Sequence, residues 1–124
     1  MEIIKFGDDD NENRLATDPS RAELLPFGAV LLDTAGRVLK YNKAECGISG
    51  RSVDQVLGKN FFEDIAPCAK GYAFYNHFYR AVSEGNINVV FNYKFDYKMA
   101  PTEVKIHMKS RDVKTGIWVF IKRL

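Results

Sequence analysis

The chain has 124 residues, of which 46% are hydrophobic and 13% aromatic, and a formal net charge of +2 at pH 7. These values predict one globular domain with its own core and exclude a disordered chain. The charge is too small to indicate nucleic-acid binding, and no apolar run has the length of a membrane span or a secretory signal. With two cysteines and no export signal, we expect no disulfide framework and a reducing, cytoplasmic location.

Residues 1–25 predict a polar segment with short helical pieces, and residues 26–124 predict the folded core. The segment contains an acidic run at Asp8–Glu12. Asp18 and Pro19 are typical of a helix start, because aspartate caps free amides and proline fits the first helical position. Pro26 is expected to end this segment.

Five short runs that are apolar or alternate between apolar and polar residues predict strands: 28–33, 37–42, 89–97, 103–109 and 117–121. The links between successive strands have hairpin length, except for the block after the second strand, so the sheet is expected to be antiparallel. Basic residues gather late in the chain, and we interpret them as a solvated sheet face or edge: Lys105, Lys109, Arg111, Lys114, Lys122 and Arg123.

The block between the second and third strands predicts helices. Ser52 and Gln55 form a capping box, and Gly58 ends that short helix. The strongest helix is Phe74–Glu84, because apolar residues recur every four positions before the stop at Gly85. The order of elements indicates an α+β fold in which this block covers one face of the sheet.

Two features indicate a binding site. Cys68 ends an apolar run before a glycine-containing loop, a setting that suits either an inert packed thiol or an attachment point. Tyr41 and Glu45 are four residues apart where a strand becomes a helical turn, so both side chains can point the same way. Ser49 and Arg51 follow, and the four residues can line one pocket wall.

Several segments resemble the photoactive yellow protein family, and the similarity extends along nearly the whole chain. The segments that show it best are Tyr41–Glu45, Ile48–Arg51, Gly58–Phe62, Asp64–Cys68, Phe95–Tyr97, Val104–Met108 and Trp118–Arg123. The resemblance implies a blue-light photoreceptor with the PAS fold and not an enzyme. It also implies a central five-stranded antiparallel sheet with helices on one face and an N-terminal helical cap on the other.

The resemblance further implies that p-coumaric acid (4-hydroxycinnamic acid) is attached to Cys68 as a thioester. Tyr41 and Glu45 then hold its phenolic oxygen as a buried phenolate, Ser49 supports the tyrosine, and Arg51 shields the group from solvent. Other implied pocket residues are Phe61, Ile65 in place of a valine, Ala66, Pro67, Phe95, Tyr97 and Met99. Light is expected to isomerise the bound group from trans to cis, after which Glu45 gives up its proton and residues 1–25 loosen.

Three positions depart from the family: Cys46 replaces a glycine, and Lys43 and Lys98 add positive charge. We interpret Cys46 as an exposed bystander, with a modest perturbation of the pocket or a redox-sensitive second thiol as the alternatives. The downstream signalling protein is unknown, and we expect a monomer, with a weak dimer as the alternative.

Two other classes of function fit parts of the sequence. The main alternative is a chromophore-free PAS module that senses a ligand or binds a partner. A cysteine hydrolase would pair Cys68 with His77 or His107, yet no oxyanion loop is evident. Histidine and cysteine are not spaced for a metal site.

Overall fold

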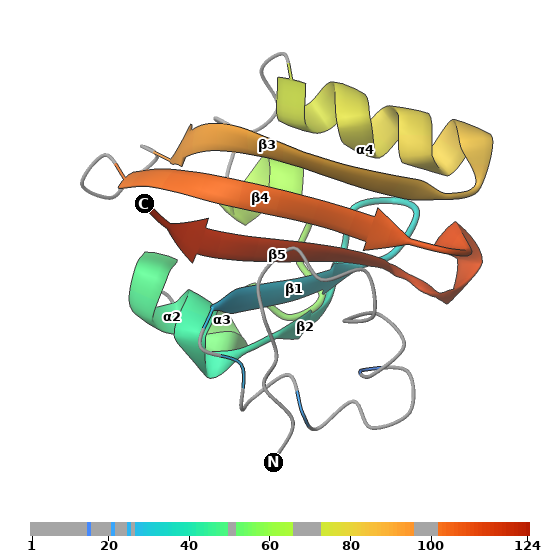
Figure 1. Ribbon diagram of the computed structural model, residues 1–124. Coiled ribbons are helices and arrows are strands. Elements are labelled where there is room, and N and C mark those ends of the chain that lie inside the picture. Colours follow the sequence, from blue (N-terminus) through green and yellow to red (C-terminus); the bar gives the residue numbers. More distant parts are fainter. Residues whose placement is uncertain are drawn as a thin grey trace.

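A computed structural model describes residues 15, 21, 25, 27–49, 52–65, 73–95 and 102–124. They form a five-stranded antiparallel sheet in the order β2-β1-β5-β4-β3 (Figure 1). The strands are β1 (Gly28–Leu32), β2 (Val38–Tyr41), β3 (Ile87–Phe95), β4 (Thr102–Ser110) and β5 (Ile117–Arg123). The predicted strands and their antiparallel pairing are confirmed. β3 begins two residues earlier than predicted, and its predicted end at Tyr97 lies outside the described residues.

Between β2 and β3 lie α2 (Lys43–Ser49), α3 (Val53–Val56), the π-helical turn η2 (Phe61–Ile65) and α4 (Ala73–Glu84), and a 3-10 turn, η4 (Val113–Thr115), precedes β5. The backbone N–H of Ser52 donates to Gln55 Oε1 at 2.9 Å, as the capping box predicts. Gly58 and Gly85 have φ values of +79° and +89°, which suit the glycine stops predicted at both helix ends. The π-helical turn is not visible in the sequence pattern.

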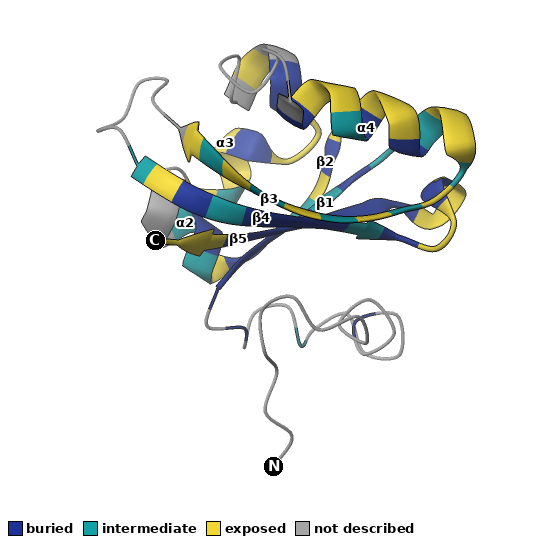
Figure 2. Ribbon diagram, turned by 45° about the horizontal axis from the view of Figure 1, so that its top comes forward, coloured by how far each residue is buried: buried dark blue, intermediate teal, exposed yellow. Residues whose placement is uncertain are grey.

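The sheet presents a different kind of surface on each side. One side, the helix face, presents alternate residues such as Val104, Ile106 and Met108 to a large buried cluster that includes Phe74 and Phe78 of α4. Figure 2 shows α4 lying over this side of the sheet. The helix block therefore covers one face, as predicted.

The other side, the cap face, has a smaller buried cluster. Its described members are Leu15, Leu25, Phe27, Ala29, Trp118 and Phe120. Leu15 and Leu25 belong to the N-terminal segment, and both are buried there. The predicted cap on this face is thus confirmed at these two residues. Leu15 is α-helical and Arg21 is in a 3-10 turn, and the rest of the predicted helical pieces lie outside the described residues.

The turn between β1 and β2 also holds the segment that leads toward Cys68. Asp33 Oδ1 accepts hydrogen bonds from the N–H groups of Ala35 and Arg37 at 2.9 and 2.8 Å. The N–H of Phe61 donates to Gly36 O at 2.8 Å, and Asn60 Nδ2 donates to Ala35 O at 2.8 Å. The start of η2 is therefore fastened to the first hairpin.

Candidate functional site

Glu45 is buried at the join between α2 and β1. Its side chain is 2% exposed, which is rare for a glutamate. Gly28 of β1 lies against it: a Cβ atom at position 28 would come within 3.2 Å of Glu45 Cβ and Cδ and would collide with Oε2. Glycine at position 28 thus leaves the space in which the carboxyl group sits.

Asn42 fixes the start of the helix that bears Glu45. Its Oδ1 accepts hydrogen bonds from the N–H of Glu45 at 3.0 Å and from the N–H of Ala29 at 2.9 Å. Its Nδ2 donates to Phe27 O at 3.0 Å, and its own N–H donates to Ala29 O at 3.0 Å. Asn42 is therefore both the N-cap of α2 and a clamp between that helix and β1.

Neither Gly28 nor Asn42 was predicted from the sequence as a site residue. An asparagine directly before a helical segment is a recognised cap signal and could have been found. Gly28 gave no such signal, because its neighbour across the site is 17 positions away in the chain.

Tyr41 ends β2 opposite Val30 of β1 and is 4% exposed, within the helix-face cluster. A buried phenol and a buried carboxyl group thus lie four residues apart on adjoining elements. Both groups can donate a hydrogen bond when protonated, so this pair suits an anionic partner in a dry site. That both side chains hold the same group stays a prediction.

Phe61, a predicted pocket residue, lies in an aromatic cluster on the helix face. Its ring centroid is 5.6 Å from that of Phe74 and 5.2 Å from that of Phe62. Phe74 in turn contacts Phe91 and Tyr93 of β3 at 5.5 and 5.4 Å. These rings connect η2, α4 and β3 into one apolar wall.

Most of the remaining predicted site residues lie outside the described part of the chain. This applies to Arg51, Ala66, Pro67, Cys68, Tyr97 and Met99, and also to Lys98. Only the backbone is described for three others: Ser49 in α2, Ile65 in η2 and Phe95 in β3.

Cys46 is partly buried and packs against the helix-face cluster, so its interpretation as an exposed bystander is wrong. The reason is tertiary packing: α2 brings Cys46 against the helix-face cluster, a contact that its position in the sequence does not reveal. Lys43, the first residue of this helix, is exposed.

The two histidines lie on different faces of the sheet. The ring of His77 in α4 stacks on that of Phe91, with 4.7 Å between the centroids. The pKa of His77 lies below the usual 6.5, mainly because the ring is partly buried and also because the Arg80 guanidinium is near. His107 of β4 is fully buried, and its Nε2 lies 2.7 Å from Asn88 Oδ1.

In the described ranges, no three or more His, Cys, Asp or Glu side chains are placed to hold a metal ion. No described helix is both long and apolar enough to cross a membrane.

Comparison with known proteins shows the family. The model of the PAS fold matches residues 19–124. The chain is 56% identical over 124 residues, 100% of both chains, to photoactive yellow protein of Cereibacter sphaeroides. It is 54% identical over 123 residues, 99% of both chains, to photoactive yellow protein of Rhodobacter capsulatus.

A solved structure agrees with these relatives. It is the photoactive yellow protein domain of the sensor histidine kinase Ppr from Rhodospirillum centenum, with a TM-score of 0.77 and 36% identity over 83% of this chain and 90% of that one. The fold, the buried glutamate and the full-length similarity lead to one conclusion. The chain belongs to the photoactive yellow protein family, a family of blue-light photoreceptors with the PAS fold.

Proposed function

We propose that this protein senses blue light through p-coumaric acid held as a thioester on Cys68, with Tyr41 and Glu45 binding its phenolic oxygen. The observation that supports this most is the burial of the Glu45 carboxyl group against Gly28, at a helix start clamped by Asn42. Burying a carboxyl group costs free energy unless it is protonated and hydrogen-bonded, so a carboxyl group placed here suits the role of a hydrogen-bond donor in a dry site. The bound group would supply light absorption and a trans-to-cis isomerisation.

The Tyr41 hydroxyl and the protonated Glu45 carboxyl group would reduce the free-energy cost of burying the phenolate. Burying an isolated anion costs on the order of 20 kcal/mol in the idealised limit. Hydrogen bonds to a charged group return about 1.5–3 kcal/mol each, so a phenol and a protonated carboxylic acid together offset part of that cost. Burial favours the protonated form of Glu45, because a dry site penalises the carboxylate.

Glu45 also provides the switch. When its hydrogen bond is weakened by isomerisation, Glu45 passes its proton to the phenolic oxygen and becomes a buried carboxylate. An uncompensated charge at such a position costs several kcal/mol, which is comparable with the whole stability of a small domain. The protein relieves this cost by opening locally, and residues 1–25 are the segment that detaches from the cap face of the sheet.

The other predicted residues have supporting roles. Ser49 orients the Tyr41 hydroxyl, and Arg51 keeps solvent from the bound group. The walls of the pocket are formed by Phe61, Ile65, Ala66, Pro67, Phe95, Tyr97 and Met99. Residues 1–25 act as the releasable cap and residues 26–124 as the PAS core.

We further propose that the signal passes to a separate protein in the cytoplasm. The Rhodospirillum centenum domain belongs to a sensor histidine kinase, which makes a kinase-linked partner a reasonable class to search first. The role is sensory and not catalytic.

The test is a reconstitution with activated p-coumaric acid. The protein should turn yellow and bleach reversibly in blue light. Cys68→Ser should abolish the colour, whereas Cys46→Ser, which changes the only other cysteine, should keep it. A colourless product with a bare thiol at position 68 would instead support the chromophore-free PAS module.

The role of Glu45 has its own test. Glu45→Gln should move the absorption band to longer wavelength, because the weaker amide donor leaves the phenolate charge freer to delocalise. Glu84→Gln, at an exposed position of α4, is the matched control and should leave the band in place. An unchanged spectrum and photocycle in Glu45→Gln would contradict the assigned role.

A further inference from the structure

The two edges of the sheet differ in how their backbone is paired. At the β2 edge, the N–H of Val38 donates to Lys59 O and the N–H of Gly58 donates to Val38 O, both at 2.9 Å. At the other edge is β3. For residues 89–92, in the middle of β3, the described part of the chain supplies backbone pairing from β4 only. An edge strand of this kind is a template on which a further strand can pair.

β3 also lacks the features with which edge strands usually avoid such pairing. It is nine residues long, and its register with β4 is continuous, without a bulge. It contains no proline, and its single charged residue, Lys94, is next to its end. Short edges, bulges, prolines and charges in mid-strand are the common protections, so this strand favours association.

The core-facing side chains of β3 are only partly covered. No described side chain of this strand is buried, whereas every other strand has buried side chains. The partly covered residues are apolar and pack against the helix-face cluster at its margin: Ile87, Val89, Phe91 and Tyr93. A second apolar row beside this one would remove more of it from water, which is favourable.

The strand is complementary to a second copy of itself. Antiparallel pairing about a two-fold axis at Phe91 overlaps the whole strand, because Phe91 is its midpoint. In this register Val89 is opposite Tyr93 of the second copy on the helix side, and Val90 is opposite Asn92 on the cap side. Apolar residues therefore meet apolar residues where the core ends, and the more polar side stays in water.

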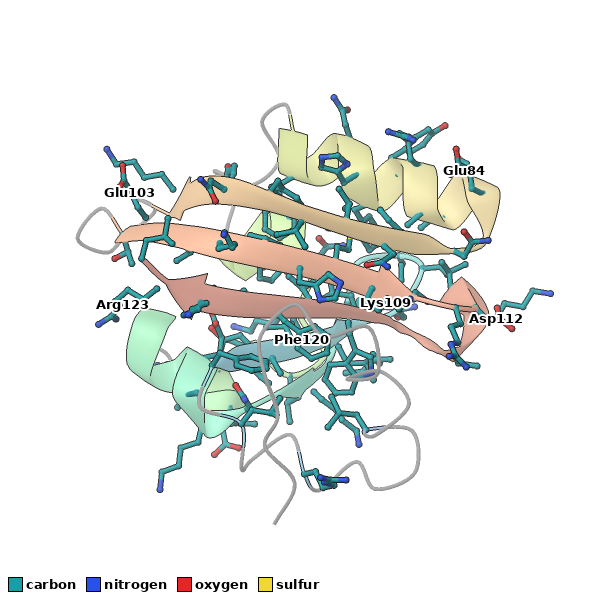
Figure 3. The ribbon with its side chains drawn as sticks, in the orientation of Figure 1. Glu84, Glu103, Lys109, Asp112, Phe120 and Arg123 are labelled. Carbon is teal, nitrogen blue, oxygen red and sulfur yellow. The ribbon has the colours of Figure 1, made fainter. Side chains whose placement is uncertain are left out.

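The charges are compatible with this register. Lys94 is opposite Asn88 of the second copy, at the end of the strand that follows Glu84 and the negative C-terminal end of α4. Figure 3 shows Glu84 at that end of α4, and Glu103, which is opposite Lys94 within one copy, at the other end of the sheet. The two lysines are offset by about 20 Å along the strands, well beyond the Debye length of about 8 Å at physiological ionic strength.

We propose that two copies of this chain associate through β3, antiparallel and centred on Phe91, so that one sheet continues from one copy into the other. Backbone hydrogen bonds and burial of the apolar row supply the attraction. A contact between two edges is smaller than the ~1,600 Å² interface of a typical stable complex. We therefore expect a weak dimer, with a Kd on the order of 0.1–1 mM. The association does not depend on a bound chromophore.

The first experiment is sedimentation velocity of the full-length protein in the dark, from about 10 µM to about 1 mM, a range that spans the expected Kd. The mean mass should rise reversibly toward that of a dimer. Hydrogen exchange over the same range should slow in peptides from β3. It should stay constant in peptides from β2, whose edge is already covered within one copy.

Variants then locate the contact. Val90→Lys puts two lysines diagonally across the two strands, with Cβ atoms about 7–8 Å apart, and should weaken association by ~3- to 10-fold. Leu39→Lys adds the same charge on β2 and is the matched control, because Leu39 and Val90 are both 48% exposed. It should leave the association unchanged.

A mixing experiment tests the register. Asn92→Glu alone should weaken association, because the two glutamates also lie diagonally across the strands. Mixed with Val90→Lys, it puts a lysine directly opposite a glutamate, so the mixed pair should associate ~3- to 10-fold more tightly than either variant alone. Mixing Asn92→Glu with Leu39→Lys should give no such gain.

Three results would overturn this proposal. One is a protein that stays monomeric up to about 1 mM, well above the lower end of the expected Kd range. Another is equal weakening by Leu39→Lys and Val90→Lys, which would assign association to a different surface. The third is a mixture of Val90→Lys and Asn92→Glu that associates no more tightly than its components.

Discussion

Strands β4 and β5 present Ile106, Met108 and Val119 on one side and Lys105, Phe120 and Lys122 on the other. On the helix face, rings from η2, α4 and β3 pack against one another and against the strands. On the cap face, the described apolar contacts of the N-terminal segment come from Leu15 and Leu25. Among the described residues, the same two strands therefore support a large core on the helix face and a smaller cluster on the cap face.

This difference bears on how the molecule can respond to light. A closely packed aromatic cluster has low compressibility and resists gradual deformation. A segment with few buried anchors opens at a lower free energy than the core does. If Glu45 becomes charged as proposed, we expect the cap face to open before the core on the helix face does.

The largest expected loss of stability comes from a substitution in the aromatic cluster on the helix face. Phe74→Ala removes a fully buried ring that contacts Phe61, Phe62, Phe91 and Tyr93, and it should lower the free energy of unfolding by about 3–5 kcal/mol. Urea unfolding followed by circular dichroism measures this. Tyr79→Ala, on the exposed side of the same helix, is the control and should cost far less.

The matching change on the cap face should act locally. Leu25→Ala removes a buried anchor and should loosen the segment by about 2 kcal/mol or more. Faster hydrogen exchange in residues 1–25 and stronger acrylamide quenching of Trp118 are expected, with urea unfolding of the core little changed. Equal losses in cap and core would show that the two faces do not open separately.

Gly28→Ala tests whether the Glu45 carboxyl group needs the space that Gly28 leaves open. The added Cβ collides with the carboxyl group, so we expect a loss of about 1–3 kcal/mol and a shifted absorption band in the reconstituted protein. In a Glu45→Ala background the collision with Oε2 is removed and only the 3.2 Å approach to Cβ remains, so the same substitution should cost less. A double-mutant cycle on unfolding free energies measures the coupling.

Asn42→Ala removes the N-cap of α2 and its link to β1. A cap loss of about 1 kcal/mol is expected in urea unfolding. Faster exchange should appear at the Glu45 amide, which donates to Asn42 Oδ1. Ser52→Ala, at the exposed cap of α3, should leave that amide unaffected.

The smallest effect concerns His77 and pH. Because its pKa is lowered in the fold, the unfolded chain binds a proton more readily below about pH 6.5. The contribution of His77 to stability is therefore present above that pH and is lost as the pH falls further. Comparing urea unfolding of the protein and of His77→Gln at pH 7.5 and 5.5 should show a smaller pH dependence in the variant, and equal dependence would contradict this.

Local patterns predicted much of this molecule. The period-two runs predicted the strands, and the four-residue recurrence from Phe74 predicted α4, because both depend on neighbours close in sequence. The Tyr41–Glu45 spacing and the family resemblance predicted that both residues matter, and both are buried. The glycine stops at Gly58 and Gly85 were predicted for the same reason, since a positive φ is a local requirement.

Long-range packing decided the rest. The contact of Gly28 with Glu45, the partial burial of Cys46 and the opposition of Lys105 and Lys122 each depend on which strand or helix lies beside which. Side-chain periodicity says which residues share a face, but it does not say what faces them. The amino-acid order thus specified the elements and the chemistry they hold, and the sheet order, which puts β1 and β5 side by side at its centre, decided which of those groups meet.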